Sequence, residues 1–584
     1  MTSGWTGRVL EIDLFKQTHR VIEPDKALYE KFVGGKGMAG HYLSEHATVS
    51  WDDPQMPVLM FTGPLVGTNA PTSGRMTVVS RSPQTGTVAD ASVGGAFGTK
   101  LKKSGYDGII IRGRAGKWTG VEIDNTKVRF TDASQLTRLP LPLAYKKLNY
   151  HGSTAMIGPA AERGVIFASL MVDRHFAAAR GGIGLCFANK RLKYVSVNGT
   201  KEVAVANKSA LKRAREDILR LVAASQILMG EHGIAALGTP ALYDLVHTRR
   251  MMPTDNFKET FFEHAPKLNA DSLRRTYSPQ KVGCTGCHIL CKKKSSNAMH
   301  LPEYETLAHF TALLKNTDLN AAVQANTLCN DFGMDTISVA GTLAAHSEIT
   351  GEDITGERIV ELIRNIGEMV GIGAKLAQGS ARYAAEAGYP QASMSVKNLE
   401  LPAYDPRGAY GMSLAYAVST RGGCHLRAYP IGHEILRKPV ATDRFSFDGK
   451  ARIIKISEDN NALVDSLTAC KFVFFASSFE EYAAAFTAIT GVSMTATDLS
   501  LIGERIYYQD KLLNARWGFD AKDDDLPARF FNEPGTNGPG FNVPAIDRDA
   551  FLNARDKYYK IRGVDANGVP TRKTAQRLGL PWID

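Results

Sequence analysis

Three of the seven cysteines lie within eight residues, and this cluster limits the possible folds more than any other feature. Cys284, Cys287 and Cys291 form a C-x2-C-x3-C pattern. In a short loop of this kind several thiolates can converge on an iron–sulfur cluster that takes a fourth ligand from elsewhere. A structural zinc site is the alternative. Such a site usually shows a second close C-x2-C pair, and the other cysteines stand alone at positions 186, 329, 424 and 470. The spacing favours an iron–sulfur cluster over zinc, and over a disulfide framework.

The composition is that of an ordinary globular protein. The 584 residues predict about three or four domains, and 44% are hydrophobic and 22% charged. No segment approaches the ~20 apolar residues of a membrane span, and the N-terminus lacks a secretory signal, so we expect a cytoplasmic protein without a membrane span. The net charge of +11 suits an anionic cofactor or an acidic partner. We expect no nucleic-acid binding, because no motif for it is recognised.

The apolar pattern divides the chain into three parts. Residues 1–204 are rich in short β-prone runs separated by glycine-rich turns, whereas helical spacing dominates from about residue 205. We expect an α+β fold with a β-rich N-terminal base domain (1–204) and two largely helical domains (205–400 and 401–584). Close backbone approaches are predicted at the glycine pairs 34–35, 94–95 and 181–182. The predicted strands include residues 8–13, 58–61, 76–80, 108–112, 121–123, 127–130 and 192–197; the predicted helices include 208–224, 306–332, 356–370, 372–387, 450–467, 479–489 and 498–517.

Several segments around the cysteines carry a resemblance to a known family. They are residues 63–75 (GPLVGTNAPTSGR), 94–98 (GGAFG), 158–162 (GPAAE), 177–184 (AAARGGIG), 302–306 (PEYET), 400–408 (ELPAYDPRG), 421–425 (RGGCH) and 501–505 (LIGER). Each is a weak signal alone. In this order, and with the cysteine cluster between them, they resemble the tungsten-containing aldehyde:ferredoxin oxidoreductase family over nearly the whole chain.

The resemblance implies a cofactor at the junction of the three domains. It would be a tungsten bis-pyranopterin with a [4Fe–4S] cluster beside it and Mg²⁺ bridging the two pterin phosphates. Because dithiolenes hold the metal, molybdenum is an alternative to tungsten. The implied reaction is the oxidation of a small aldehyde to a carboxylic acid. The electrons would leave through the cluster to an acidic ferredoxin or an iron–sulfur partner subunit.

Matching the family motifs onto this chain implies the residues that hold the cofactors. The segment 465–470 matches D-x-x-G-L-C, so Cys470 is the expected fourth cluster ligand and Asp465 an acceptor for pterin N–H groups. Thr468 and Ala469 replace the glycine and leucine of that motif. The segment 330–335 matches D-x-x-G-L-D, with Asn330 in place of the first aspartate. The other cofactor-binding residues are Met334 and Asp335 in this segment, Arg75 between phosphate and cluster, the carbonyls of Ser92 and Ala177 near Mg²⁺, and the basic Arg180 and Arg427.

Glu305 and His425 are the expected catalytic pair. The resemblance gives Glu305 the role of base and His425 that of a hydrogen-bond donor to the carbonyl oxygen. The family's Glu-x-x-His dimer motif reads Gln324-Ala-Asn-Thr327 here, so any oligomer is not expected to form through that metal bridge. The basic run 292–294 follows the third cluster cysteine and is expected either to help dock an acidic carrier or to form a solvated loop.

Two alternatives stay open from the sequence. A subunit of the same superfamily could act on another substrate, such as an aromatic acyl thioester. A pterin-free iron–sulfur electron-transfer or scaffold subunit would carry iron but neither tungsten nor pterin.

Overall fold

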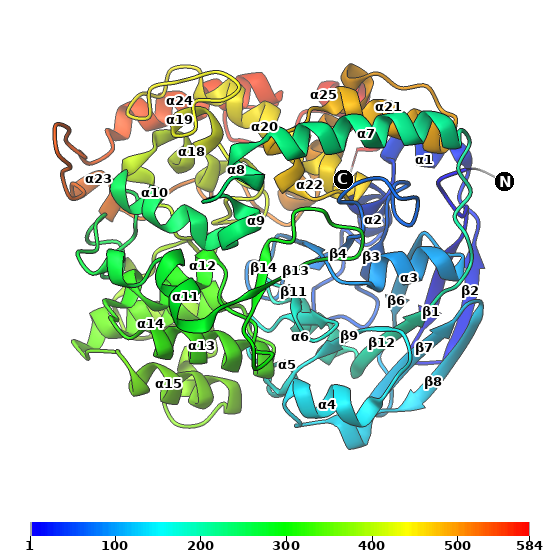
Figure 1. The fold of residues 1–584 in the computed structure, drawn as a ribbon, viewed down its shortest axis with the longest axis horizontal. Helices are drawn as coiled ribbons and strands as arrows, with labels where there is room; N and C mark the ends of the chain where they lie inside the picture. The colour runs from blue at the N-terminus through cyan, green and yellow to red at the C-terminus, as the bar shows by residue number, and fades with distance from the viewer. Residues whose placement is uncertain (1–2, 583–584) are drawn as a thin grey trace.

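The computed structural model describes residues 3–582 and places two six-stranded sheets in the N-terminal third of the chain (Figure 1). Both sheets are mixed, because β1 pairs parallel with β6 and β12 parallel with β7, while the other neighbours are antiparallel. The first sheet has the order β2 (Thr18–Ile22), β1 (Val9–Asp13), β6 (Gly108–Arg112), β3 (Val58–Phe61), β4 (Met76–Arg81), β5 (Val88–Val93). The second has the order β11 (Phe176–Ala178), β10 (Leu170–Val172), β9 (Ser153–Ile157), β12 (Leu192–Asn198), β7 (Thr119–Asp124), β8 (Lys127–Asp132).

Short helices pack between and beside these strands: α1 (Lys26–Phe32), α2 (Gly35–Ser44), α3 (Phe97–Ser104), α4 (Leu141–Leu148), α5 (Pro159–Arg163) and α6 (Ile183–Asn189). The two sheets meet through their edges, since β5 of the first contacts β11 of the second. This contact brings Ser92 and Ala177 to the line where the sheets join.

From residue 208 onward the chain is largely helical, and the α+β fold class is confirmed. In the view of Figure 1 the helices lie to the left of the β-rich part and along its top. They are α7 (Lys208–Ala224), α8 (Gln226–Met229), α9 (Ile234–Leu237), α10 (Tyr243–Thr248), α11 (Ala270–Tyr277), α12 (Tyr304–Phe310), α13 (Leu319–Phe332), α14 (Thr336–Thr350), α15 (Glu357–Glu368), α16 (Gly373–Leu376), α17 (Gly379–Glu386), α18 (Tyr410–Val418), α19 (Ile431–Glu434), α20 (Lys450–Leu467), α21 (Phe479–Thr490), α22 (Ala496–Arg516), α23 (Arg529–Asn532), α24 (Arg548–Arg562) and α25 (Arg572–Arg577). Two short strand pairs interrupt them, β13 (Gln280–Val282) with β14 (Lys292–Lys294) and β15 (Ser395–Val396) with β16 (Leu399–Glu400).

One hydrophobic core runs through all three parts, with buried side chains from Trp5 to Leu580. The three parts therefore pack against one another. No helix among residues 3–582 is both long and apolar enough to cross a membrane. The domain boundaries at 204 and 400 stay a prediction.

The predicted close approaches at glycine pairs are confirmed. A Cβ on Gly35 would lie 2.3 Å from the carbonyl oxygen of Asp465, and one on Gly182 would lie 2.2 Å from that of Ile166. A Cβ on Gly94 would lie 2.2 Å from the Sγ atom of Cys284. Two of these three contacts involve segments that carry predicted site residues, so the glycines allow distant parts of the chain to meet at the site.

Candidate active site and cofactor cradle

The cysteine loop is the connection of the β13–β14 hairpin, which pairs Val282 with Lys292. The loop lies on the β-rich part. Besides the contact of Cys284 with Gly94, a Cβ on Gly74 would lie 2.3 Å from the carbonyl oxygen of Thr285. Any side chain at either glycine would push the loop away. The loop thus depends on two glycines of the N-terminal part.

Cys470 joins the three loop cysteines from the third part of the chain. It follows α20, and its backbone N–H donates to the carbonyl oxygen of Thr72 at 2.9 Å. Burial raises the pKa of Cys470 to about 11, with Arg75 opposing the shift and Cys284 and Cys287 adding to it. The thiol of Cys470 is thus close enough to those of Cys284 and Cys287 for their charges to influence one another. Among residues 3–582, no three His, Cys, Asp or Glu side chains are grouped to hold a single metal ion.

Arg75 connects the cysteines to the edge strand β5. Its Nε and Nη2 donate to the Oγ atom and the carbonyl oxygen of Ser92, at 2.9 and 2.6 Å, and Nη1 lies 4.0 Å from the Sγ atom of Cys284. Burial opposes its charge, but Cys470, Cys284 and Asp465 outweigh that effect and raise the pKa of Arg75. Arg75 therefore lies between the cysteines and β5, and its expected role between phosphate and cluster stays a prediction. The carbonyl of Ser92 is already engaged by Arg75, and Ala177 is exposed on β11.

The basic run after the third cysteine mostly faces inward. Lys292 pairs with Glu303 at 3.1 Å and lies over the ring of Phe176. Lys293 is buried, and its Nζ donates to the carbonyl oxygen of Leu290 at 3.1 Å. These two lysines hold the loop in place, which corrects the expectation that the whole run is available to an acidic carrier.

A buried charge network lies where the three parts meet. Arg427 contacts the carboxylates of both Asp90 and Asp465, and Lys471 donates to the Oδ2 atom of Asp465 at 2.8 Å. Burial works to raise the pKa of Asp90, but Arg427 and neighbouring cations lower it well below its usual range. Arg427 and Lys471 both contact the same oxygen of Asp465, Oδ2. The other oxygen, Oδ1, is buried without a hydrogen-bond partner among the described residues.

Sequence reasoning missed part of this network. Lys36 is buried, 3.1 Å from the Oδ2 atom of Asp90 and 2.7 Å from that of Asp510. Arg421 donates to the carbonyl oxygen of Asp90 and, at 3.1 Å, to the Sγ atom of Cys424. A signal was present: Lys36 stands between glycines and Asp90 inside an apolar strand, where an isolated charge is costly without a partner.

The D-x-x-G-L-D segment lies at the turn between α13 and α14. Asp335 caps the N-terminus of α14, accepts from Ser338 Oγ at 2.9 Å and lies 3.5 Å from the Nε atom of Arg180. Asn330 instead donates to the carbonyl oxygen of Asn326 at 2.8 Å, within its own helix. Met334 and Ala469 are buried and contribute packing.

Arg180 joins this turn to the third part of the chain. Its Nη2 donates to the carbonyl oxygens of Glu400 and Gly423, while its buried Nη1 has no hydrogen-bond partner among the described residues. Arg180 therefore keeps a free donor at the junction.

Glu305 and His425 come together, as predicted. Glu305 is in the first turn of α12, and its Oε2 atom accepts the backbone N–H of Ala403 at 2.7 Å. Its Oε1 atom has no hydrogen-bond partner among the described residues and lies 3.4 Å from the Nε2 atom of His425. Burial raises the pKa of Glu305 to about 8, and burial with Arg180 and Arg421 lowers the pKa of His425 well below its usual value. The side chains remain 17% and 15% exposed, so a small molecule can reach them.

Aromatic rings surround this pair. The ring centroid of Tyr404 lies 5.5 Å from that of His425 and 5.6 Å from that of Tyr429, which in turn is 6.2 Å from Phe475. Tyr429 and Phe475 are only partly buried. Next to His425, burial works to raise the pKa of Cys424, but Arg421, Arg427 and Arg180 outweigh it and lower the pKa to about 7. The site thus combines an apolar wall with a positive potential.

Comparison with known proteins agrees with this arrangement. The family description "Aldehyde ferredoxin oxidoreductase, N-terminal domain" matches residues 9–199, and "Aldehyde ferredoxin oxidoreductase, domains 2 & 3" matches residues 213–580. A tungsten-containing aldehyde ferredoxin oxidoreductase from Thermococcus kodakarensis is 35% identical, and one from Pyrococcus furiosus is 33% identical, each over 99% of both chains. A second Pyrococcus furiosus protein, the WOR-like subunit of an aliphatic sulfonate oxidoreductase, is 26% identical over 99% of this chain and 97% of its own.

Among solved structures, a chain of the active-site complex of benzoyl coenzyme A reductase with 1,5-dienoyl-CoA has the same fold. The TM-score is 0.84 at 22% identity, over 100% of this chain and 98% of that one. The matched family descriptions together span the described sheets, the cysteine loop and the helical parts. The chain belongs to the aldehyde ferredoxin oxidoreductase family and is an oxidoreductase.

Proposed function

We propose that this protein oxidises small aldehydes to carboxylic acids and passes the electrons to an acidic iron–sulfur carrier such as ferredoxin. The observation that carries the proposal is the half-buried pair of Glu305 and His425, with Oε1 and Nε2 3.4 Å apart. Relatives named as tungsten-containing aldehyde ferredoxin oxidoreductases support it.

The residues at the junction fit a buried, charged cofactor. Within the described part of the chain, Arg180, Arg421 and Arg427 each keep a buried N–H without a hydrogen-bond partner, and Asp90 and Asp465 each keep such an oxygen. Buried polar atoms of this kind are costly unless a ligand satisfies them. A bis-pyranopterin with tungsten or molybdenum would supply the two-electron oxidation. In this proposal the arginines hold its phosphates, Asp465 its ring N–H groups, the Ser92 and Ala177 carbonyls Mg²⁺, and the four cysteines a [4Fe–4S] cluster.

The catalytic pair handles protons. Oxidation of an aldehyde takes one oxygen atom from water and releases two electrons and two protons. The N–H of Ala403 fixes the Oε2 atom of Glu305, so the unpartnered Oε1 atom is the one that accepts a proton. His425 stays neutral and can donate its own N–H to the carbonyl oxygen of the substrate.

The aromatic wall indicates which aldehydes fit best. The rings of Tyr404 and Tyr429 lie next to that of His425, and Phe475 lies beside Tyr429. Such rings favour a substrate whose remainder is apolar. We therefore infer a preference for aromatic or aliphatic aldehydes over hydrophilic sugar aldehydes.

Electrons would leave through the cysteine loop, because part of this loop is exposed. Thr285, Gly286 and His288 are exposed there, and Arg215 of α7 lies 3.4 Å from the Nε2 atom of His288. Arg215 and Lys281 place positive charge around this loop. This surface, rather than the inward-facing Lys292 and Lys293, is the proposed docking site of an acidic carrier.

Two measurements on protein purified from its native host test the proposal. Metal and phosphorus analysis should find tungsten or molybdenum together with iron, and a panel of aldehydes with a viologen dye as acceptor should show turnover with apolar aldehydes. Iron without tungsten, molybdenum or pterin would instead indicate an electron-transfer or scaffold subunit. A loaded enzyme that reacts with an acyl thioester and with no aldehyde would overturn the substrate class.

A further inference from the structure

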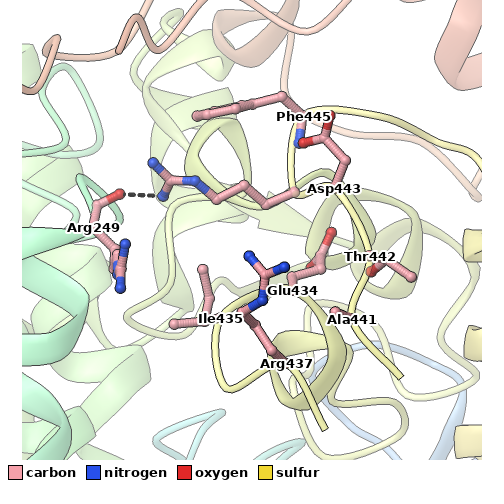
Figure 2. Close-up of a pocket in the computed structure, with 9 residues that line it drawn as sticks. Arg249, Glu434, Ile435, Arg437, Ala441, Thr442, Asp443 and Phe445 are labelled. Atoms are coloured by element: carbon pink, nitrogen blue, oxygen red, sulfur yellow. Dashed lines mark hydrogen bonds between the residues drawn. The ribbon is translucent and has the colours of Figure 1, made fainter. Parts of the chain in front are cut away.

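A pocket of about 440 Å³ lies between the end of α10 and the loop that joins α19 to α20 (Figure 2). Three arginines from two segments line it: Arg249 after α10, and Arg437 and Arg444 in the loop between α19 and α20. Figure 2 shows the side chains of Arg249 and Arg437 reaching into the same space from different segments of the chain. None of the three belongs to the catalytic pair or to the cofactor cradle.

These arginines carry no carboxylate partner. Within residues 3–582, neither Arg249 nor Arg437 forms a side-chain hydrogen bond or ion pair that would neutralise it. The Nη1 atom of Arg444 donates to the carbonyl oxygens of Arg249 and Gly408, at 2.6 and 3.3 Å. Its guanidinium stacks against the ring of Phe445, 4.4 Å from the centroid. Burial, followed by the charge of Arg249, lowers the pKa of Arg444; Glu434 and Asp443 offset only part of this effect, so Arg249 and Arg444 repel each other.

Two acidic residues, Glu434 and Asp443, also line the pocket, but each already accepts hydrogen bonds from other groups. Glu434 accepts the N–H of Gly411 at 2.8 Å and pairs with Lys450 at 3.1 Å. Burial also raises the pKa of Glu434 to about 7, which reduces its negative charge at neutral pH. Asp443 accepts the backbone N–H of Phe445 at 2.9 Å. The pocket is left with a surplus of positive charge.

We propose that this pocket binds a small organic phosphate. Guanidinium groups bind phosphate oxygens in pairs, and an anion would relieve the repulsion among the arginines. The pocket is much larger than a phosphate ion and lies within the ~300–1,000 Å³ range of small-molecule sites. Ile435 and the Phe445 ring provide an apolar wall for the organic part of the ligand.

Isothermal titration of the holoenzyme with adenosine diphosphate, inorganic pyrophosphate and citrate tests this site without reference to turnover. Arg249→Gln and Arg437→Gln each remove one unpaired guanidinium and break no described contact. Each should weaken adenosine diphosphate binding about ten-fold or more, the effect of one lost charge-assisted hydrogen bond. Lys438→Gln is the matched control, because it removes the same charge from the same loop at a residue that does not line the pocket.

Adenosine diphosphate should bind more tightly than pyrophosphate, and citrate most weakly. Heat from Mg²⁺ chelation elsewhere would be the same in all variants and can be subtracted. The proposal is overturned if neither phosphate probe binds saturably, if Lys438→Gln weakens binding as much as Arg437→Gln, or if citrate binds as tightly as adenosine diphosphate. None of these outcomes bears on aldehyde oxidation, so the two proposals fail independently.

Discussion

Burial of Glu305 determines how the catalytic pair holds its protons. The carboxyl is fixed by the N–H of Ala403 on one oxygen, and its pKa is raised to about 8. His425 is held neutral at 3.4 Å. A carboxyl of ordinary pKa would be fully ionised at neutral pH. This one is poised so that it can both take up and release a proton close to that pH.

The pH dependence of kcat/KM follows from this shift. Below pH 8 most Glu305 is protonated and cannot accept a proton, so the rate of aldehyde oxidation with a dye acceptor should rise with pH and level off above about 8. Glu303→Gln is the control. Glu303 pairs with Lys292, which lowers its pKa, so its loss should leave the midpoint unchanged. A rate that falls between pH 6 and 9 would contradict the role of Glu305 as base.

Substitution of either partner should remove most activity. Glu305→Gln keeps the shape of the side chain but loses the proton acceptor, and His425→Asn keeps a side-chain N–H but loses the ring with its Nε2 donor; each loss is worth roughly 10²–10⁴-fold in rate. Neither residue is a proposed ligand, so tungsten and iron contents should match those of the wild type. Rates close to wild type in either variant would refute its assignment.

At the scale of elements, the sequence predicts a helix correctly where the apolar spacing of one segment is enough to determine it. The helix predicted over 208–224 forms as α7 and that over 450–467 as α20, because their apolar spacing runs without interruption. The helix predicted over 306–332 is broken, since Lys315 adopts a positive φ and Asp318 starts a new helix by capping α13. The break at Gly379 in 372–387 has the same cause, a positive φ between two in-phase apolar stretches. The spacing of apolar residues indicates which face of a helix is buried, but it does not show where a turn breaks the helix.

The contact of the cysteine loop with β5 gives a prediction at this scale. Gly94→Ala would place a methyl group 2.2 Å from the Sγ atom of Cys284, so the loop must move and the variant should lose much of its iron and labile sulfide. Gly116→Ala is the matched control, because nothing lies within 4 Å of its added Cβ. Both proteins should fold, as judged by circular dichroism. A full iron content in Gly94→Ala would show that the loop does not depend on this contact.

The face formed by α7 and the cysteine loop should govern electron transfer to the carrier. Arg215→Gln combined with Lys281→Gln removes the half-buried Arg215 cation beside His288 and the exposed Lys281 cation on β13. Turnover with ferredoxin should fall several-fold at low salt and less at high salt, because charge steers the encounter, while turnover with a viologen dye should not change. Lys375→Gln on distant α16 is the control. Equal rates with ferredoxin for both variants would exclude this docking face.

At the scale of the whole molecule, the junction could not be read from the sequence. The family motifs indicated Asp465 and Arg427, but Lys36, Asp90 and Asp510 complete the network from three further segments. Each looks like a lone charge in its own surroundings. Only tertiary packing shows that they neutralise one another, and that several of their polar atoms remain unpartnered.

Cofactor loss should therefore loosen the contact among all three parts. A ligand that binds only the folded protein stabilises it by mass action, and here it would also satisfy buried atoms of Arg180, Arg427 and Asp465. Protein from cells grown without tungsten or molybdenum should have a Tm several degrees lower than the loaded protein. Hydrogen exchange should speed up in residues 34–40 and 461–470, which meet at Gly35, and stay unchanged in the peripheral helix α15. Equal Tm values, or faster exchange in α15 alone, would show that the cofactor does not hold the junction together.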